Sequence, residues 1–272
     1  MVIGTNPAVS APNGLHVEER LKSLNFMAVS DFFISETASM ADVVLPTTQW
    51  AEEEGTMTNL EGRVILRQQA VAPPDGVMSD TDIISELARR LGKGHYFEYT
   101  GAEAIFSELR RASAGGIADY SGITYEKIRD NAGIYWPCPS ESHPGTPRLF
   151  GNAVVDGDRF LPPPGFFTVS GRARFHAIRH RSPAEVPDAD YPIYLTTGRV
   201  MAHYQSGTQT RRQGRLVEMA PEATVELHPI LALRHRISEG EKVQVETRRG
   251  RATFRAKLST GIREDTIFAP FH

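Results

Sequence analysis

The chain has 272 residues, of which 30 are Lys or Arg and 33 are Asp or Glu, so its formal net charge is -3. This balance gives no indication of a nucleic-acid or membrane surface, and no apolar run reaches the roughly 18 residues of a transmembrane helix. Cys138 is the single cysteine, which excludes an internal disulfide and a four-thiolate iron–sulfur site within these residues. We therefore expect a globular protein of one large domain or two ordinary ones.

Residues 1–95 alternate between segments typical of strands and segments typical of helices. The strand-like segments are residues 2–4, 26–31, 42–46 and 58–71, and the helix-like segments are residues 15–24, 36–41 and 79–92. Such alternation predicts an α/β layer with a parallel sheet, here an incomplete doubly wound one.

The segment 79–92, SDTDIISELARRLG, is the clearest helix signal. Ser79 or Asp80 can cap its first turn, and Gly92 ends it. The helical spacing predicts one apolar stripe, formed by Ile83, Ile84, Leu87 and Leu91.

Residues 96–188 are predicted to connect two domains. Two helices are expected at 101–112 and 124–133, and the stretch 136–167 is rich in Pro and Gly and is typical of loops with short strands. Residues 172–178, RARFHAI, are a further candidate strand. The polar, Pro-containing residues 181–190 indicate a domain boundary.

Residues 189–272 have short strands around one small helix, which predicts a compact β-barrel. The expected strands are 191–198, 223–229 and 266–271, together with a hairpin over 241–258 in which Gly250 supplies the turn. The helix is expected at residues 229–236.

The stretch 196–212, TTGRVMAHYQSGTQTRR, contains Thr and Ser hydroxyls, one His and three Arg, and no acidic residue occurs between Asp190 and Glu218. A strand that ends in Thr-Gly presents backbone N–H groups where a ligand can approach closely. Hydroxyls and Arg side chains add further donors, so the loop is suited to an anion such as a pyrophosphate. Each residue taken singly is also typical of an ordinary solvated turn.

That stretch resembles the molybdopterin oxidoreductases of the dimethyl sulfoxide reductase superfamily, whose members carry two molybdopterin guanine dinucleotides. The resemblance extends through VELHP, the TRRG hairpin and IREDTIFAPFH, and upstream through IGTNPAVSAPN, ETASMADVVLPTTQWAEEEGTMTNLEGRV and HPGTPRLF. HYQSGTQTRR and WPCPSESHPGTPRLF are most similar to catalytic chains of assimilatory nitrate reductases. Formate dehydrogenase chains remain an alternative, as does a non-catalytic cofactor-binding module.

The resemblance implies a set of cofactor-binding residues. They are Asn6 in the TNP turn, Ser30 and Asp31 at a strand end, Asp80, Phe271, and the loop residues Thr197, Gly198, Arg199, Val200, Met201, Ala202, His203, Tyr204, Gln205 and Ser206. A carboxylate can accept both N–H donors on the pairing edge of guanine. Asp80 is also placed to cap a helix, and Asp31 to form an ordinary turn at the strand end.

Two positions depart from the family pattern. Glu53 stands where periplasmic nitrate reductases have a cofactor-contacting Lys, and a carboxylate there would repel a phosphate. Arg234 through Ile237 replace a Leu-Gly-Ile stretch, so the helix before them must end without Gly or continue further.

The resemblance implies three regions: a partial α/β molybdopterin oxidoreductase domain at 1–95, a connecting region at 96–188, and a dinucleotide-binding double-psi β-barrel of six or seven strands at 189–272. It also implies a cytoplasmic molybdenum enzyme that takes electrons from a donor protein or subunit and reduces a small molecule, nitrate or alternatively formate. The molybdenum bis(molybdopterin guanine dinucleotide) would be accompanied by a 4Fe-4S cluster bound elsewhere in a parent chain. The resemblance assigns no catalytic residue, which leaves the catalytic residues unknown, and no metal ligand is expected among these residues.

The two ends of the sequence are unlike the polar, frayed ends of most domains. VIG at the start and TIFAPFH at the end are typical of strands. We therefore expect a fragment of a longer chain, without turnover by itself and marginally stable because of unpaired sheet edges.

Overall fold

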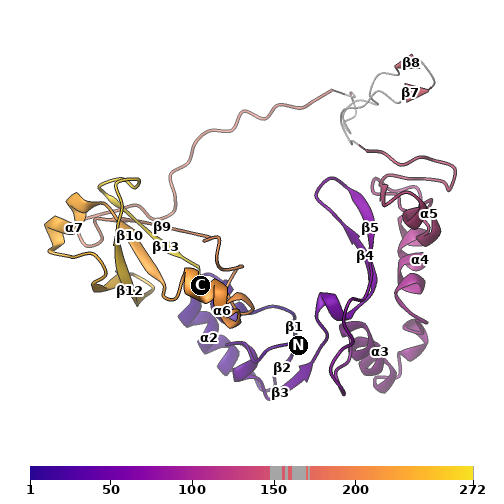
Figure 1. Ribbon diagram of the computed structural model, residues 1–272, viewed down its shortest axis with the longest axis horizontal. Coiled ribbons are helices and arrows are strands. Elements are labelled where there is room, and N and C mark those ends of the chain that lie inside the picture. Colours follow the sequence, from indigo (N-terminus) through magenta and orange to yellow (C-terminus); the bar gives the residue numbers. More distant parts are fainter. Residues whose placement is uncertain (148–154, 157–158, 161–169, 171, 272) are drawn as a thin grey trace. The chain divides into compact units, whose positions relative to one another are not determined.

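The computed structural model describes residues 1–147, 155–156, 159–160, 170 and 172–271, and the chain divides into two compact units (Figure 1). Unit 1 comprises Met1–Pro46 and His180–His272, and unit 2 comprises Thr47–Arg179. Unit 1 is therefore built from two segments that are far apart in the sequence. The Pro- and Gly-rich stretch predicted to be loop lies partly outside the described residues.

A parallel sheet of three strands forms the first part of unit 1, in the order β1-β2-β3. Its strands are β1 (Val2–Ile3), β2 (Ala28–Asp31) and β3 (Val43–Pro46). The helices α1 (Pro7–Ser10) and α2 (Gly14–Lys22) connect β1 to β2, and the 3-10 helix η1 (Ala38–Met40) precedes β3. Parallel neighbours need such crossovers, and the predicted α/β layer is confirmed for these strands.

The middle strand of this sheet lies in a small apolar core. Met27, Val29 and Ala38 are buried there, and Leu21 of α2 and Val44 of β3 pack against them. A strand of a parallel sheet is covered on both faces, which explains the uninterrupted apolar sequence that leads into β2.

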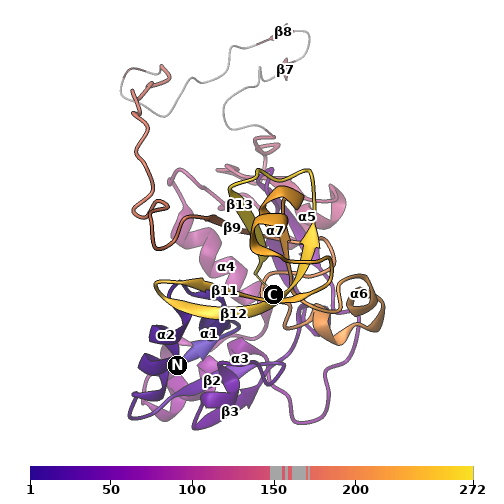
Figure 2. The same cartoon turned by 90° about the vertical axis from the view of Figure 1, so that its left-hand side faces the viewer.

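The second part of unit 1 is a mixed sheet of five strands in the order β11-β12-β10-β13-β9. The strands are β9 (Tyr194–Gly198), β10 (Thr224–Leu227), β11 (Lys242–Thr247), β12 (Gly250–Leu258) and β13 (Thr266–Pro270). The hairpin of β11 and β12 is confirmed (Figure 2). Its turn is Arg248 and Arg249, whereas Gly250 already belongs to β12 and pairs with Thr247.

The six or seven strands predicted for this region exceed the five that form the sheet. In the described part of the chain, β9 and β11 are the edges and do not pair with each other. Residues between β9 and β10 form a loop, the 3-10 helix η4 (Thr210–Arg212) and the helix α6 (Gly214–Met219) instead of a strand. Their sequence lacks the alternation of apolar and polar residues that a half-buried strand needs.

The helix α7 (Pro229–His235) packs on this sheet, where Leu231 and Ala232 are buried with Leu227 and Ala256. The side chain of His228 caps its first turn by accepting a hydrogen bond from the N–H of Ile230 at 3.2 Å.

The end of α7 bears out the expectation that a helix without a terminal Gly ends in a less favoured conformation. Arg236 follows the last helical residue with a left-handed backbone, φ +58°. A non-glycine residue in this region costs about 1 kcal/mol or more. The neighbouring Ile237 packs against the sheet core, and this burial offsets the cost.

The segment before β9 is fastened to the hairpin by ion pairs. Arg248 bonds to the carboxylates of Asp188 and Glu185, and Arg249 bonds to Glu185. The guanidinium of Arg248 also lies 4.6 Å from the centre of the Tyr191 ring. This segment and the sheet line an open hollow of about 690 Å³, whose lining side chains are largely apolar.

Unit 2 contains helices α3 (Asp80–Arg90), α4 (Ala102–Ser113) and α5 (Tyr125–Asp130), which confirms the three helices predicted there. Its strands are β4 (Gly55–Thr58), β5 (Arg63–Arg67) and β6 (Ile134–Tyr135), which form one antiparallel sheet, and the pair β7 (Val155–Asp156) and β8 (Arg159–Phe160). Two short 3-10 helices complete the unit, η2 (Trp50–Glu52) and η3 (Gly94–Tyr96).

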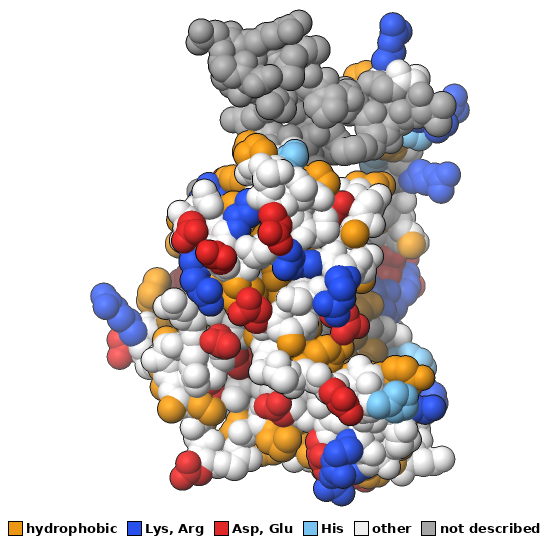
Figure 3. Space-filling view, turned by 90° about the vertical axis from the view of Figure 1, so that its right-hand side faces the viewer, with side chains coloured by type: hydrophobic (Ala, Val, Ile, Leu, Met, Phe, Trp, Pro, Cys, Tyr) orange, Lys and Arg blue, Asp and Glu red, His pale blue; other side chains and the backbone are white. Residues whose placement is uncertain are grey.

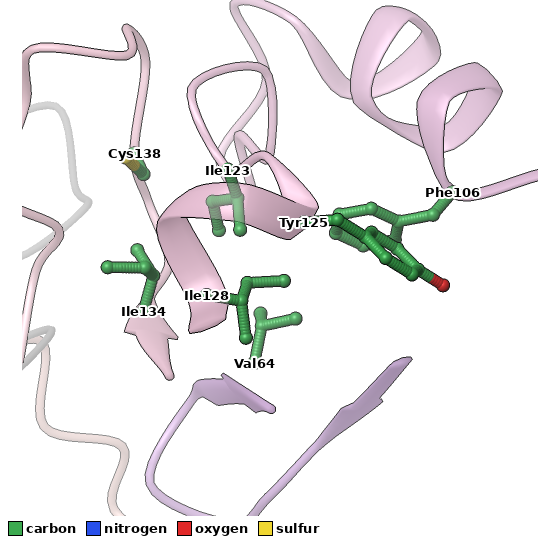
Figure 4. Packing of buried hydrophobic residues seen from close by; sticks show 7 residues of the cluster. All are labelled: Val64, Phe106, Ile123, Tyr125, Ile128, Ile134 and Cys138. Atoms are coloured by element: carbon green, nitrogen blue, oxygen red, sulfur yellow. The ribbon is translucent and has the colours of Figure 1, made fainter. Parts of the chain in front are cut away.

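The core of unit 2 is formed by side chains from α4, α5, β5, β6 and the loops beside them (Figure 4). Its members are Val64, Phe106, Ile123, Tyr125, Ile128, Ile134 and Cys138. The Tyr125 ring lies beside Phe106, with its hydroxyl turned away from the other labelled side chains. Cys138 is fully buried, as expected for a structural thiol, and its sulfur lies 3.3 Å from the Lys127 ammonium.

Two predictions for this unit are wrong in part. The helix stripe predicted for α3 buries only Ile83, whereas Ile84, Leu87 and Leu91 are 37%, 43% and 68% exposed. A helical period identifies a helix but does not identify what covers its apolar face. Residues 172–178 form no strand, and their Phe175 is 94% exposed, because no neighbouring strand hydrogen-bonds to them.

Charged side chains of both signs are interspersed over the face of the molecule in Figure 3. In the described part of the chain, no helix is both long enough and apolar enough to cross a membrane.

Replacing Ile128 by Ala should lower the free energy of unfolding of unit 2 by about 2–5 kcal/mol, because the side chain is 2% exposed and its loss leaves a cavity. Urea unfolding followed by tryptophan fluorescence measures this. The matched control is Ile117→Ala, whose side chain is 70% exposed and should change the free energy by less than about 0.5 kcal/mol. Equal effects of the two changes would contradict the described core.

Replacing Arg249 by Gln should raise the pKa of Glu185. In the folded protein this pKa is lowered, and the hydrogen bond from Arg249 is the main cause. Because the folded pKa is lowered, the pairing contributes its full stability at pH values above the ordinary carboxyl pKa. This contribution is lost as the pH falls through the lowered folded pKa. Carbon-13 NMR titration of Glu185 measures the shift. Arg251→Gln, two residues further along in β12, should leave the pKa of Glu185 unchanged; an equal rise there would refute the specific pairing.

Candidate functional site

Polar side chains stand at the carboxyl edge of the parallel sheet of unit 1. β1 and β2 run in the same direction with Ile3 opposite Ser30, so Asn6 follows one strand while Ser30 and Asp31 end the next. All three of these predicted site residues are buried. The carboxyl edge of parallel strands is where α/β sheets usually bind ligands.

The Asp31 carboxylate forms the turn after β2. One of its oxygens accepts hydrogen bonds from the N–H groups of Phe32 at 2.9 Å and Phe33 at 3.4 Å, and the other accepts one from the Ser35 hydroxyl at 2.8 Å. Asp31 is 8% exposed. The structure therefore gives this residue a definite turn-forming role, and a contact with a ligand would use its remaining lone pairs.

The side chain of Asn6 joins three segments of unit 1. Its oxygen accepts hydrogen bonds from the Thr37 N–H at 3.1 Å and the Thr37 hydroxyl at 2.8 Å. Its nitrogen donates to the Glu36 carboxylate at 2.7 Å and to the Thr208 hydroxyl at 3.2 Å. Asn6 therefore links the turn after β1, the residues before η1 and the loop after β9.

The loop after β9 is tightly folded around Gly207. Gly207 has φ +73° and the preceding Gln205 has φ +53°, both left-handed. The Arg211 N–H donates to the Gly207 carbonyl at 2.8 Å, and a Cβ at Gly207 would come within 3.1 Å of the Arg211 side chain. Glycine at this position thus permits Arg211 to lie close against the loop backbone.

His203 holds the same loop from inside. Its Nε2 lies 2.8 Å from the Ala220 carbonyl, so this nitrogen donates. Its Nδ1 lies 3.1 Å from the Thr210 hydroxyl, which in turn accepts from the Tyr204 N–H at 3.2 Å. His203 is 5% exposed, and its two ring nitrogens stabilise the loop.

The basic residues of the loop meet the first segment of unit 1. Arg211 forms an ion pair with Glu36 at 2.9 Å. The guanidinium of Arg212 lies 4.4 Å from the centre of the Phe33 ring. Partial burial raises the pKa of Glu36, but hydrogen bonds from Asn6, from its own backbone and from Arg211 outweigh this, so the pKa lies below its ordinary value.

The other predicted residues of the loop differ in their environment. Thr197 and Gly198 lie in β9 opposite Ala269 and Pro270. Ala202 is buried, Val200 and Ser206 are partly buried, and the exposed side chains are those of Arg199, Met201, Tyr204 and Gln205.

Phe271 follows β13, and its N–H donates to the Gly198 carbonyl at 3.1 Å. Its ring is 47% exposed.

Asp80 and Glu53 belong to unit 2. Ser79 caps α3 by accepting from the N–H of Asp82 at 3.1 Å, so Asp80 is the first helical residue and accepts instead from the Thr47 hydroxyl at 3.0 Å. Glu53, at the position where periplasmic nitrate reductases have a Lys, forms an ion pair with Arg67 at 3.2 Å. Arg67 thus compensates the negative charge of the Glu53 carboxylate.

The structure adds residues that the sequence analysis did not select: Glu36, Thr37, Thr208, Arg211 and Arg212. The basic residues were noted in the acid-free stretch, but the predicted site stopped at Ser206. Continuing it to the end of TQTRR would have included Thr208 and Arg211. Glu36 had no signal of its own, since only its contacts across the unit identify it.

This donor set is suited to an anionic ligand. It combines an amide, hydroxyls and a guanidinium at the surface of unit 1, and a hollow of about 300 Å³ lined by His203, Arg211 and Glu222, among others, adjoins the loop. Guanidinium groups and amides both donate to phosphate oxygens. Within the described ranges, no group of three or more His, Cys, Asp or Glu has the arrangement of a metal site.

Comparison with known proteins gives matches over these same segments. A model of the molydopterin dinucleotide binding domain matches residues 193–272, and a model of the molybdopterin oxidoreductase domain matches residues 1–90. Asn6 and Glu36 thus fall in one match, and Thr208 and Arg211 fall in the other.

Two curated relatives are similar along nearly the whole chain. The assimilatory nitrate reductase catalytic subunit of Bacillus subtilis is 48% identical over 98% of this chain and 36% of its own length. The F420-dependent formate dehydrogenase subunit alpha of Methanocaldococcus jannaschii is 43% identical over 100% of this chain and 38% of its own length. The chain thus spans little more than a third of these relatives.

A solved structure has the same fold. Acetylene hydratase from Pelobacter acetylenicus matches with a TM-score of 0.75 and 23% identity, over 98% of this chain and 36% of that chain. The two matched domains and the curated relatives show that the chain belongs to the molybdopterin oxidoreductases and includes their dinucleotide-binding domain.

Proposed function

We propose that unit 1 holds the guanine dinucleotide part of a molybdopterin cofactor, in an enzyme that reduces nitrate to nitrite. Two contacts carry this proposal: the hydrogen bond from Asn6 to Thr208 and the ion pair of Arg211 with Glu36. They bring donors of both segments together at the carboxyl edge of the parallel sheet. These donors come from the two segments that match the family's domains.

The fit to a dinucleotide rests on the chemistry of the donors. A diphosphate accepts hydrogen bonds and carries negative charge, which Arg211 and the Asn6 amide complement. The proposed contacts in unit 1 are Asn6, Ser30, Asp31, residues Thr197 through Ser206 and Phe271, to which we add Thr208 and Arg211. Asp80 is proposed as a cofactor contact from the resemblance alone. When bound, the molybdenum centre would supply the two-electron chemistry, while these residues bind and orient the cofactor.

Further features of the enzyme follow from the same proposal. The cofactor is a molybdenum bis(molybdopterin guanine dinucleotide), and the 4Fe-4S cluster binds outside these 272 residues, which contain one Cys. We also propose that the five-stranded sheet of unit 1 belongs to a double-psi barrel. The proposed domain ranges of the chain are residues 1–95, 96–188 and 189–272. The enzyme is cytoplasmic and takes electrons from a donor protein or subunit, in keeping with its likeness to an assimilatory nitrate reductase.

Formate oxidation is the second candidate, because a formate dehydrogenase subunit is 43% identical over the whole chain. The identity to the nitrate reductase subunit is 48%, which favours nitrate.

Guanosine diphosphate, which carries both guanine and diphosphate, should bind to the protein, and Arg211→Gln should weaken this binding about 10-fold or more. The physical reason is that a hydrogen bond to a charged group contributes about 1.5–3 kcal/mol. Isothermal titration calorimetry measures the dissociation constant. Arg251→Gln removes the same charge from β12 and should leave binding within about twofold; equal losses would mean that net charge alone attracts the ligand.

The intact gene product, loaded with its cofactor and supplied with a reduced viologen dye, should form nitrite from nitrate. The same preparation with formate and oxidised dye should show much slower dye reduction. Faster turnover of formate than of nitrate would replace the first candidate by the second, and leave the dinucleotide site in place.

A further inference from the structure

The carboxylate of Glu36 occupies the donors that an anionic ligand of unit 1 needs. It accepts the Asn6 amide at 2.7 Å and pairs with Arg211 at 2.9 Å, so it bridges one donor from each segment of the unit. A phosphate oxygen would bind to these donors with the same hydrogen-bond geometry as the carboxylate oxygen. The two acceptors cannot both take the same N–H groups.

We propose that Glu36 is an internal competitor of the diphosphate, and that its side chain turns away from Asn6 and Arg211 when the nucleotide binds. This inference rests on the proposed function, because it concerns the same site. Glu36 then sets the affinity for the nucleotide without being one of its ligands.

The surroundings of Glu36 permit this exchange. Its side chain is 46% exposed, so it can rotate into water without opening the fold. Asp31, by contrast, is 8% exposed and holds three hydrogen bonds of its own turn, so it cannot leave in the same way. Glu36 has a pKa below its ordinary value, so it is ionised and competes throughout the neutral pH range.

The Asn6 amide and the backbone of Arg211 remain in place when Glu36 leaves. The oxygen of Asn6 is held by the N–H and hydroxyl of Thr37, which keeps the amide nitrogen directed at the site. The backbone of Arg211 is held by Gly207 at 2.8 Å. A donor that is oriented in advance, as the Asn6 amide is, loses little conformational entropy on binding.

Two substitutions separate displacement from simple repulsion. Glu36→Gln removes the charge, and Glu36→Asp keeps the charge on a side chain shorter by one methylene, which cannot span both donors. Displacement predicts that both variants bind guanosine diphosphate about two- to fivefold tighter than the wild type, the range expected for loss of an exposed ion pair. The control Glu264→Gln breaks the Arg234–Glu264 pair at the surface and should leave binding unchanged.

The measurement is calorimetric titration of the protein with guanosine diphosphate at pH 8, where the terminal phosphate is fully ionised. Tighter binding by Glu36→Gln alone, with Glu36→Asp like the wild type, would show repulsion by charge and overturn the inference. Weaker or unchanged binding by both variants would overturn it too, because Glu36 would then support the site or have no part in it. An equal gain in Glu264→Gln would also count against it.

A second arm tests whether Arg211 is the contested donor. In the Arg211→Gln background, Glu36→Gln should bring less than half of its gain in the wild-type background, and an undiminished gain would overturn the inference. Absence of binding in the wild type and in every Glu36 variant would instead refute the proposed function, and this inference with it. Binding by the wild type that Glu36 does not influence refutes the inference alone.

Discussion

Buried and partly buried donors must have acceptors, and in unit 1 this requirement centres on the Asn6 side chain. Its oxygen and nitrogen serve Thr37, Glu36 and Thr208, which lie on segments separated by more than half of the chain. An unmade hydrogen bond to a buried polar group costs about 1–3 kcal/mol. The Asn6 amide thus helps the turn after β1 to position the loop after β9, together with the Arg211–Glu36 ion pair.

The elements of regular structure were largely predictable because their signals are local. The helix at 79–92 has its cap and its terminal glycine in the sequence, and both are used as predicted. For the end of α7 the sequence left two outcomes open, an end without glycine or a longer helix, and the left-handed Arg236 shows that the first is correct. The exposure of Ile84 and Leu87 in α3 was not predictable, because the helical period does not show which part of the fold packs against the apolar face.

The candidate site was predictable only on the side where its residues are consecutive. The acid-free stretch and the resemblance together marked the loop after β9, but the partners of that loop lie elsewhere in the chain. Glu36 gave no sequence signal as a partner of Arg211, because 175 positions separate them. His203 was selected for its place in the family loop, and only the structure shows that its ring bonds to Thr210 and Ala220.

Because the Glu36 carboxylate lies within the cluster of donors, the binding free energy of a ligand is the difference between the donors' interaction with the ligand and their interaction with Glu36. Without Glu36, the Arg211 guanidinium and one N–H of the Asn6 amide would lose their acceptor, and the loop would lack the ion pair at 2.9 Å that joins it to the first segment. With Glu36 present, a bound ligand forms its own hydrogen bonds while the protein loses the Arg211–Glu36 pair. Only an acceptor of higher charge than the carboxylate therefore displaces Glu36. A diphosphate meets that condition and a single neutral acceptor does not. The same pair that orders the loop thereby discriminates against weak ligands, and selectivity follows from the contact that stabilises the fold.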